Sequence, residues 1–333
     1  MSVEDGVTRP LVEAVGLTKR FPMRRGVTDR LRRIPPTAVT AVDDVDLVVA
    51  RGEIMALVGE SGCGKSTLSR CLLRLVEPSA GEVRFEGQDI LQLDDESLRL
   101  LRPRMQIIFQ DPYTSLNPRL TARQAVSEVL QIHQVCPPEE IRERTIMIAE
   151  SVGLPTGALD RYPRSFSGGQ QQRIGIARAL AARPDFLVAD EAVSRLDVSV
   201  QVQILNLLRS LQRDLGLTIL IVAHDLAVVR YISQQVAVMY LGAIVEIART
   251  EDLFLRPSHP YTVALLDSVP KLVAGGESRQ PSLTGEPPSP LSLPSGCRFR
   301  TRCRFAQPRC AAESPRLREI SPGHVVACHY PQG

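Results

Sequence analysis

The sequence predicts an α/β protein built around parallel β-strands. Two short apolar runs, DFLVAD (185–190) and TILIVAHD (218–225), end in Asp or His, as buried parallel strands do at their carboxyl ends. The segment 53–76 joins an apolar strand, a glycine-rich turn and a helical repeat of apolar residues, which is the start of an α/β unit. Residues 198–216, between the two runs, have helical spacing and a glycine stop.

Composition limits the classes of protein to consider. The chain has 333 residues, enough for one large domain with an appendage or for two domains. Its 40 Lys and Arg are balanced by 37 Asp and Glu, so the net charge of +3 gives no reason to expect a nucleic-acid partner. No run approaches the ~18 apolar residues of a membrane span, and the acidic start MSVEDGVTRP does not fit a signal peptide. We therefore expect a cytosolic location by default.

The remaining segments surround the predicted core. Residues 11–21 mix β-prone residues with turn formers, which favours an edge strand, and the alternation in 37–50 favours antiparallel strands with one wet face. Residues 121–162 read mostly as helix. From about residue 256 the chain is proline-rich and loses its periodicity, and four of the seven cysteines lie there.

A glycine-rich loop carries the strongest chemical signal. GESGCGKST (59–67) fits the pattern G-x-x-x-x-G-K-[ST] and stands between a predicted strand and a predicted helix, as this motif requires. Its glycines let backbone N–H groups and the helix N-terminus point at a phosphate, Lys65 reaches the β- and γ-phosphates, and the Ser66 hydroxyl ligates Mg²⁺. The predicted nucleotide-binding residues are Gly59, Ser61, Gly62, Cys63, Gly64, Lys65, Ser66 and Thr67.

A pair of acids supplies the other half of such a site. In FLVADE (186–191), four apolar residues bring Asp190 to the end of a strand, where it is suited to hold Mg²⁺. Glu191 follows and is suited to polarise a water molecule in line with the γ-phosphate. Two adjacent acids after a strand also occur as a helix N-cap pair, but the loop at 59–67 favours the catalytic interpretation.

A second glycine-led helix start distinguishes the class of nucleotide-binding protein. SFSGGQQQRIGIARAL (165–180) opens a helix at Ser167, Gly168, Gly169 and Gln170, so the chain has two anion-ready helix N-termini. Two chains packed head to tail would use both. Here the sequence resembles the ABC ATPases, whose signature is LSGGQ, with Phe166 in place of the usual leucine. The resemblance implies ATP and Mg²⁺ as cofactors, and the P-loop NTPase fold of that family: a RecA-like core, an antiparallel β subdomain and a helical subdomain.

The resemblance implies roles for four further residues. Gln110 in IIFQDP resembles the Q-loop glutamine that contacts Mg²⁺ and the attacking water, and Asp197 in SRLD resembles the D-loop aspartate at a dimer interface. His224 resembles the switch histidine that contacts the γ-phosphate. Phe21 resembles the aromatic residue that stacks on adenine, although it also fits a core position.

The chain departs from the family pattern at two positions near the acids. Ala192 stands where the family usually has proline, and Arg195 where it usually has alanine. Neither change removes a catalytic group, so we expect the chain to hydrolyse ATP. Loss of the proline loosens the loop that holds Glu191, and the effect of the two changes on the rate stays open.

A narrower resemblance covers residues 11 to about 330. IIFQDPYTSLNPRLT, HPYTVALL and LTGEPPSPLSLPSGCRFRTRC are similar to segments of the ATP-binding subunits of oligopeptide/dipeptide ABC importers, in particular those that pair with a second, non-identical ATPase. This implies an ATPase domain over 8–255, with a helical subdomain at about 111–165, and a C-terminal extension over 256–333. It also implies two transmembrane permease subunits, an extracytoplasmic substrate-binding protein, and a peripheral location on the cytoplasmic face of the inner membrane.

Other functions remain open at this point. Nickel or another small solute is an alternative to peptides, because separate subunits of such a system select the substrate. A soluble ABC ATPase without a transport role is a further alternative, but such proteins usually carry two ATPase units or a long coiled coil. A regulatory module with an inactive site is opposed by Glu191 and His224.

The C-terminal extension contains four clustered cysteines with the spacing C-x5-C-x6-C-x17-C, namely Cys297, Cys303, Cys310 and Cys328. Persistent disulfides are disfavoured in the cytosol, so the cluster suggests metal. The absence of a C-x2-C knuckle argues against a common zinc ribbon. Four thiolates suit a [4Fe–4S] cluster, and the resemblance to the importer family implies one in a structural role. Zinc and unliganded thiols remain alternatives.

Overall fold

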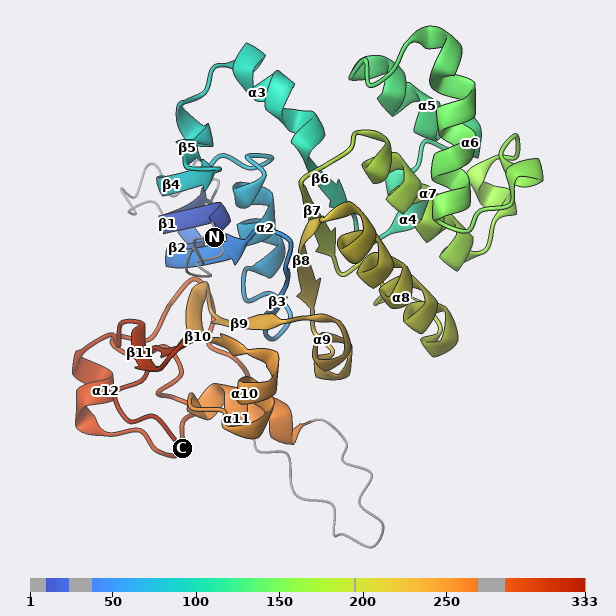
Figure 1. Cartoon of the computed structure of the whole chain (residues 1–333). Coiled ribbons are helices and arrows are strands. Elements are labelled where there is room, and N and C mark those ends of the chain that lie inside the picture. Colours follow the sequence, from blue (N-terminus) through green and yellow to red (C-terminus); the bar gives the residue numbers. More distant parts are fainter. Residues whose placement is uncertain (1–9, 24–37, 195, 269–284, 333) are drawn as a thin grey trace, which may run out of the picture. The chain divides into compact units, whose positions relative to one another are not determined.

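A computed structural model describes residues 10–23, 38–194, 196–268 and 285–332, apart from the side chain of Pro112 (Figure 1). The chain divides into two compact units, each of which is described by itself. Unit 1 comprises Met1–Leu11, Val49–Ile54 and Gln92–Val222. Unit 2 comprises Val12–Val48, Met55–Leu91 and Ala223–Gly333. Among the described residues, no helix is both long enough and apolar enough to cross a bilayer.

One sheet of unit 2 has four strands in the order β2-β1-β4-β5. Their bounds are Ala38–Ala50, Pro10–Pro22, Ala80–Phe85 and Gln88–Asp89. In β2, buried Val45, Leu47 and Val49 alternate with exposed residues, which confirms the one-sided strand predicted for 37–50. The edge position predicted for 11–21 is wrong. β1 lies between two strands because its backbone pairs on both sides, a property that the polarity of its side chains does not reveal.

The second sheet of unit 2 carries the phosphate loop. Within this unit the strand order is β11-β12-β10-β9-β3, and β3 runs parallel to β9. The bounds are Arg318–Ser321, His324–Val326, Ala243–Arg249, Gln235–Tyr240 and Ile54–Val58. All five residues of β3 are buried, as a run of apolar residues in a parallel strand requires. The α-helices in the described residues of this unit are α2 (Lys65–Leu72), α9 (Leu226–Ile232), α10 (Thr250–Leu255), α11 (Pro260–Asp267) and α12 (Pro308–Ala312).

Unit 1 contains the parallel strands β6 (Met105–Ile108), β7 (Phe186–Asp190) and β8 (Thr218–Ala223). Every residue of β7 and β8 is buried, which confirms the two parallel core strands predicted from their apolar runs. The helix predicted over 198–216 is α8 (Val198–Leu215). It ends where Gly216 adopts a left-handed conformation with φ 68°.

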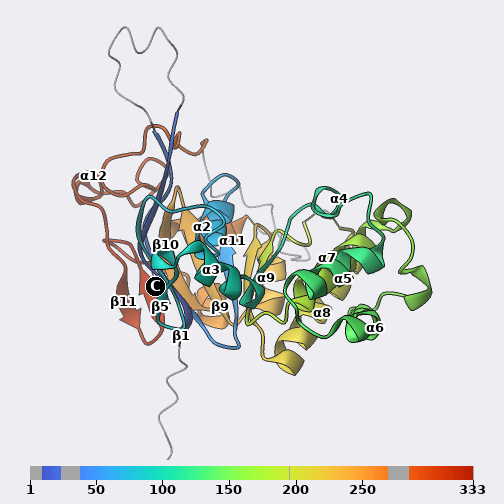
Figure 2. The ribbon, with the colours of Figure 1, turned by 90° about the horizontal axis from the view of Figure 1, so that it is seen from above.

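The other helices of unit 1 gather mainly around α7 (Gly168–Ala181). α5 (Ala122–Ile132), α6 (Ile141–Ser151) and α8 all contact it, and both views of the chain show them beside one another (Figures 1 and 2). α4 (Pro112–Ser115) also contacts α7, and α3 (Asp95–Leu101) is the remaining α-helix in the described residues of this unit. This packing fixes the start of α7, where the Ser-Gly-Gly-Gln sequence lies.

Candidate nucleotide site

The phosphate loop of unit 2 joins β3 to α2 by a turn that only glycine fits. Gly59 has φ 154° and Gly64 has φ 109°, and a Cβ atom at these positions would collide with the carbonyl oxygens of Met239 and Ala41, respectively. Gly64 is also the N-cap of α2, so it brings no side chain over the first backbone N–H groups of the helix. The loop therefore presents the backbone cradle that a phosphate group needs.

Lys65, the first residue of α2, is folded back along this loop. Its side chain is buried, and Nζ donates hydrogen bonds to the carbonyl oxygens of Gly59 at 2.8 Å and Glu60 at 2.9 Å. The neighbouring Cys63 thiol is also buried, and burial raises its pKa, so it is protonated at neutral pH. The protonated Cys63 thiol is neutral, so it does not offset the positive charge that Lys65 brings into the loop.

Unit 2 holds two other predicted site residues. Phe21, near the end of β1, is 40% exposed, with Lys19 Nζ 4.9 Å from the centroid of its ring. This exposure argues against the alternative of a core position. His224 is exposed between β8 and α9, where Asp225 caps the helix by accepting a hydrogen bond from Ala227 N–H at 2.8 Å. The nucleotide contacts predicted for both residues stay predictions.

In unit 1, the acids and the glutamine follow neighbouring parallel strands. Asp190 is the last residue of β7 and is 2% exposed. The Gln110 side chain, after β6, donates from Nε2 to Glu191 Oε2 at 2.5 Å. Because the carboxyl ends of β6 and β7 meet at one edge, the structure brings these two predicted catalytic residues together.

Glu191 adopts a strained backbone conformation. Its φ of 48° is left-handed, which is uncommon for a residue with a side chain. The backbone holds it there. Its N–H donates to Val222 O at 3.0 Å, and its carbonyl accepts from both the N–H and the hydroxyl of Ser194. Ala192 is buried in the same turn, whereas Arg195 lies outside the described residues.

The start of α7 is closed by a capping box. Ser167 Oγ accepts from Gln170 N–H, and Gln170 Oε1 accepts from Ser167 N–H at 3.1 Å. Gly169 faces α8 so closely that a Cβ atom would collide with Val200 Cγ1. Asp197 is the N-cap of α8.

These signature residues share a cavity of about 270 Å³ with the glutamine. Its lining is Gln110, Asp111, Tyr113, Ser167, Gly168, Gly169, Gln172, Ala192, Leu196, Asp197 and Val200. Three segments that are far apart in the sequence and were predicted separately thus meet in unit 1. Sequence reasoning missed Gln172, which is 1% exposed and whose Nε2 has no hydrogen-bond partner in the described part of the chain.

The predicted site residues fall in both units. The phosphate loop, Phe21 and His224 lie in unit 2, and the acids, Gln110, Asp197 and the signature residues lie in unit 1. Sequence reasoning also missed the contacts of Glu60 with Tyr261 and Arg302 in unit 2. In the sequence, the signals for these contacts were weak: Tyr261 lies in the HPYT segment, and Arg302 precedes Cys303.

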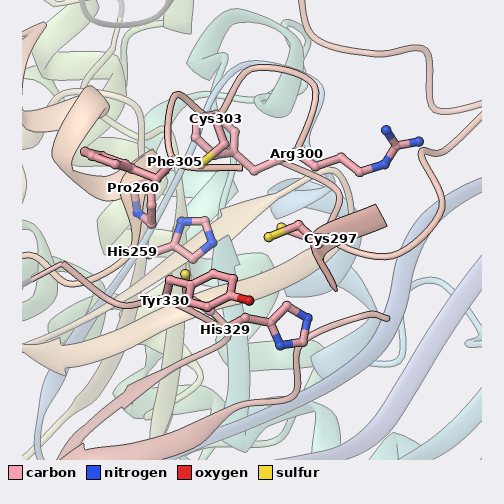
Figure 3. Close-up of a pocket in the computed structure, with 11 residues that line it drawn as sticks. His259, Pro260, Cys297, Arg300, Cys303, Phe305, His329 and Tyr330 are labelled. Atoms are coloured by element: carbon pink, nitrogen blue, oxygen red, sulfur yellow. The ribbon is translucent and has the colours of Figure 1, made fainter. Parts of the chain in front are cut away.

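The four C-terminal cysteines line one cavity with His259 and Tyr330 (Figure 3). The N–H of Cys297 donates to Cys310 O at 2.7 Å, which joins two of the cysteine segments. All seven cysteines are free thiols. His329, beside Cys328, has Nε2 2.9 Å from the carbonyl oxygen of Glu313.

The predicted metal site at these cysteines is not supported. No group of three or more His, Cys, Asp or Glu side chains in the described ranges is arranged to hold a metal ion. Burial raises the pKa of Cys297 and Cys303, and raises the pKa of Cys328 to about 11, so these thiols are protonated at neutral pH when no metal is bound. Burial also lowers the pKa of His259 to about 3, which keeps this imidazole neutral.

Comparisons with known proteins agree over nearly the whole chain. Residues 42–194 match the ABC transporter family, and residues 245–310 match the C-terminal region of oligopeptide/dipeptide transporters. A putative peptide import ATP-binding protein of Brucella ovis is 49% identical over 319 residues, which is 96% of this chain and 97% of the relative. The dipeptide transport ATP-binding protein DppF of Haemophilus influenzae is 45% identical over 321 residues, with the same coverage of both chains.

Solved structures give the same fold. The dimeric structure of MJ0796, a bacterial ABC transporter cassette, is similar with a TM-score of 0.63 and 29% identity, covering 72% of this chain and 98% of that one. CbiO1 of Clostridium perfringens, part of a cbiONQ ABC transporter complex, is similar with a TM-score of 0.63 and 27% identity, covering 74% of this chain and 91% of that one. The predicted α/β P-loop fold, with its antiparallel β subdomain and helical subdomain, is confirmed.

Proposed function

We propose that this chain, which belongs to the family of ATP-binding subunits of peptide-importing ABC transporters, hydrolyses ATP to drive the import of di- and oligopeptides. The observation that carries the proposal is the cavity of unit 1 that joins Gln110, the Ser167–Gly169 segment and Asp197. In an ATPase that works as a dimer, a cavity lined by these residues would face the nucleotide bound to the partner subunit. The resemblance of the C-terminal extension to peptide transporters favours peptides over nickel or another small solute.

The phosphate loop binds the nucleotide. Lys65 exchanges its two carbonyl partners for phosphate oxygens, and the backbone N–H groups from Gly59 to Thr67 surround the phosphate chain. Mg²⁺ prefers oxygen ligands, and the Ser66 hydroxyl, the Asp190 carboxylate and the Gln110 amide oxygen would hold it. When bound, Mg²⁺ neutralises charge on the phosphates. Phe21 stacks on the adenine.

Hydrolysis depends on Glu191 as general base. Its carboxylate takes a proton from the water that attacks the γ-phosphorus, the bond to the β-phosphate oxygen breaks, and ADP and inorganic phosphate leave. Gln110 lies 2.5 Å from this carboxylate and orients it. His224 stabilises the charge that develops on the γ-phosphate.

The signature residues act on the nucleotide of a partner. Ser167, Gly168, Gly169 and Gln170 form a second anion-ready helix start, which serves a second, homologous ATPase subunit packed head to tail. Asp197 lies at that interface. Two transmembrane permease subunits and an extracytoplasmic substrate-binding protein complete the importer. The chain then sits on the cytoplasmic face of the inner membrane as a peripheral subunit.

The domain limits belong to this proposal. We assign the ATPase domain to 8–255, with a helical subdomain at about 111–165, and the C-terminal extension to 256–333. Helices α4, α5 and α6 fall within the proposed helical subdomain. Residues 8 and 9 lie outside the described residues.

Co-purification tests the assembly. The chain is expressed with the neighbouring transporter subunits and purified in detergent, and the Lys65→Ala variant serves as a control that retains the assembly surfaces. We expect both forms to elute with a second ATPase and two multi-span membrane proteins. Elution of the chain alone or with nucleic acid would contradict a transport role.

We further propose that the four C-terminal thiols hold a [4Fe–4S] cluster with a structural role. The supporting observation is that all four line one cavity. The described thiols do not converge on a single point, as one zinc ion would require. A cluster makes a weaker demand, because its thiolate ligands bind different iron atoms. Iron analysis and absorbance near 400 nm of anaerobically purified protein test it. Zinc without iron, or neither metal, refutes it.

A further inference from the structure

Glu60, inside the phosphate loop, has three bonded polar groups. Its backbone N–H donates to the Tyr261 hydroxyl at 2.9 Å, and its carbonyl oxygen accepts from Lys65 Nζ. Its carboxylate accepts two hydrogen bonds from the Arg302 guanidinium, at 2.7 and 3.0 Å. Only Lys65 belongs to the loop itself. The other two partners lie more than 200 residues further along the chain, in the C-terminal extension.

Arg302 is held in place for this contact. Its side chain is 6% exposed, and the paired carboxylate raises the pKa of its guanidinium, so the charge is fixed and shielded from water. Its backbone N–H donates to Phe299 O at 3.0 Å. Nearby, Arg298 binds Asp43 and the carbonyl of Leu241, which attaches the same segment to unit 2 at a second place.

Tyr261 is equally constrained. It is fully buried, with its ring centroid 4.6 Å from that of Tyr240 and 5.4 Å from that of Phe299. Its backbone N–H donates to Nδ1 of His259 at 3.0 Å. The buried Glu246 carboxylate in turn accepts the backbone N–H of His259 at 2.9 Å. A continuous series of hydrogen bonds therefore runs from β10 through the start of α11 to the phosphate loop.

We propose that the C-terminal extension positions the phosphate loop for ATP through Tyr261 and Arg302, which act as positioning residues on Glu60. A phosphate cradle binds well when its N–H groups are already directed at the phosphates, because ordering a free loop opposes binding. The two contacts hold the backbone and the side chain of one loop residue against buried groups of unit 2. This inference rests on the proposed ATPase function.

The test compares ATP affinity with turnover in the full-length chain. Arg302→Met, Glu60→Gln and Tyr261→Phe are examined by the Kd for ATP in the presence of Mg²⁺, by kcat at saturating ATP, and by thermal unfolding. We expect each change to raise Kd by on the order of tenfold, with kcat within about twofold of wild type. Because Arg302 and Glu60 act through one contact, the double variant should be no worse than the weaker-binding single variant.

Two further variants sharpen the result. Arg309→Met breaks an exposed ion pair with Glu313 on the same extension and should leave Kd unchanged. Arg302→Lys keeps the charge and should recover part of the affinity. Tyr261→Phe keeps the packed ring, so it guards against simple misfolding. If the variants lower thermal stability but leave Kd for ATP unchanged, the contacts are structural only and the inference is overturned. Failure of the wild-type chain to bind ATP would instead refute the proposed function.

Discussion

Lys65 illustrates how one residue type is selected by its surroundings. Lysine accounts for three of the 40 basic residues of the chain, yet it occupies the buried position in the phosphate loop. Its ammonium group reaches two carbonyl oxygens of the loop, a geometry that suits a compact charge on a flexible stem. A guanidinium is planar and bulkier, so we expect arginine to fit this position less well than lysine.

We predict that Lys65→Ala raises the Kd for ATP by roughly 10- to 100-fold, because a charge-assisted bond to phosphate is worth about 1.5–3 kcal/mol. Lys65→Arg should also bind ATP more weakly than wild type, although it keeps the positive charge. Equilibrium titration with ATP and Mg²⁺ measures both. Tight binding by Lys65→Arg would show that charge alone is sufficient at this position.

Glu191 provides a prediction that separates binding from chemistry. Glu191→Gln keeps the shape of the side chain and its contact with Gln110 but removes the base, so kcat should fall on the order of 100- to 10,000-fold. The Kd for ATP should stay near the wild-type value. Turnover and binding assays on the same preparation test this. Near-normal hydrolysis would remove Glu191 from the role of base.

Local sequence was sufficient for residues whose partners follow from strand order. The pairing of Gln110 with Glu191 follows from two parallel strands ending at one edge, and both residues were predicted to be in the site. The ion pair between Glu60 and Arg302 spans 242 positions and produces no periodic pattern. Only the packing of the C-terminal extension brings it about, so the sequence did not reveal it.

At the scale of elements, α7 combines a capped start with close packing. The capping box of Ser167 and Gln170 satisfies N–H groups at the helix start, and Gly169 allows α8 to approach. The sequence predicted this helix and its glycines as an anion site. The sequence did not reveal that packing also requires glycine at position 169, because this follows from the position of Val200 in the structure.

We predict opposite effects of alanine at two glycines of this helix. Gly169→Ala should destabilise the fold by about 1–3 kcal/mol, because the new Cβ collides with Val200. Gly175→Ala meets no described atom within 4 Å and should stabilise the fold by up to about 1 kcal/mol through helix propensity. Urea denaturation measures both. Adding Val200→Ala should recover part of the loss, and equal effects at the two glycines would contradict the packing argument.

The element predictions failed where hydrogen bonding, rather than side-chain polarity, decided the outcome. β7, β8 and α8 were predicted to within two residues at each end because apolar runs and a glycine stop fix them. β1 was taken for an edge strand, yet it pairs with β2 and β4. Polar side chains occur on a central strand when one face of its sheet is wet, so composition does not locate the edge.

At the scale of the whole molecule, the fold and family were predictable because the short motifs and the C-terminal extension are separate sequence signals that agree. The phosphate loop, the acids and the signature gave the ATPase class, and the proline- and cysteine-rich end gave the transporter subfamily. The metal site predicted at the cysteines is not supported by the arrangement of the described side chains, because spacing alone does not determine whether buried thiols converge on one ion.

The most direct test of the account is ATP hydrolysis by the complete importer in lipid vesicles, measured with and without di- or oligopeptides and the substrate-binding protein. We predict that peptide stimulates hydrolysis. Labelled peptide should accumulate on the side of the membrane that carries the ATPase subunits with the wild-type chain, and should not accumulate there with Glu191→Gln. A rate of ATP hydrolysis that is unchanged by peptide but is stimulated by Ni²⁺ or another small solute would contradict peptide import as the function.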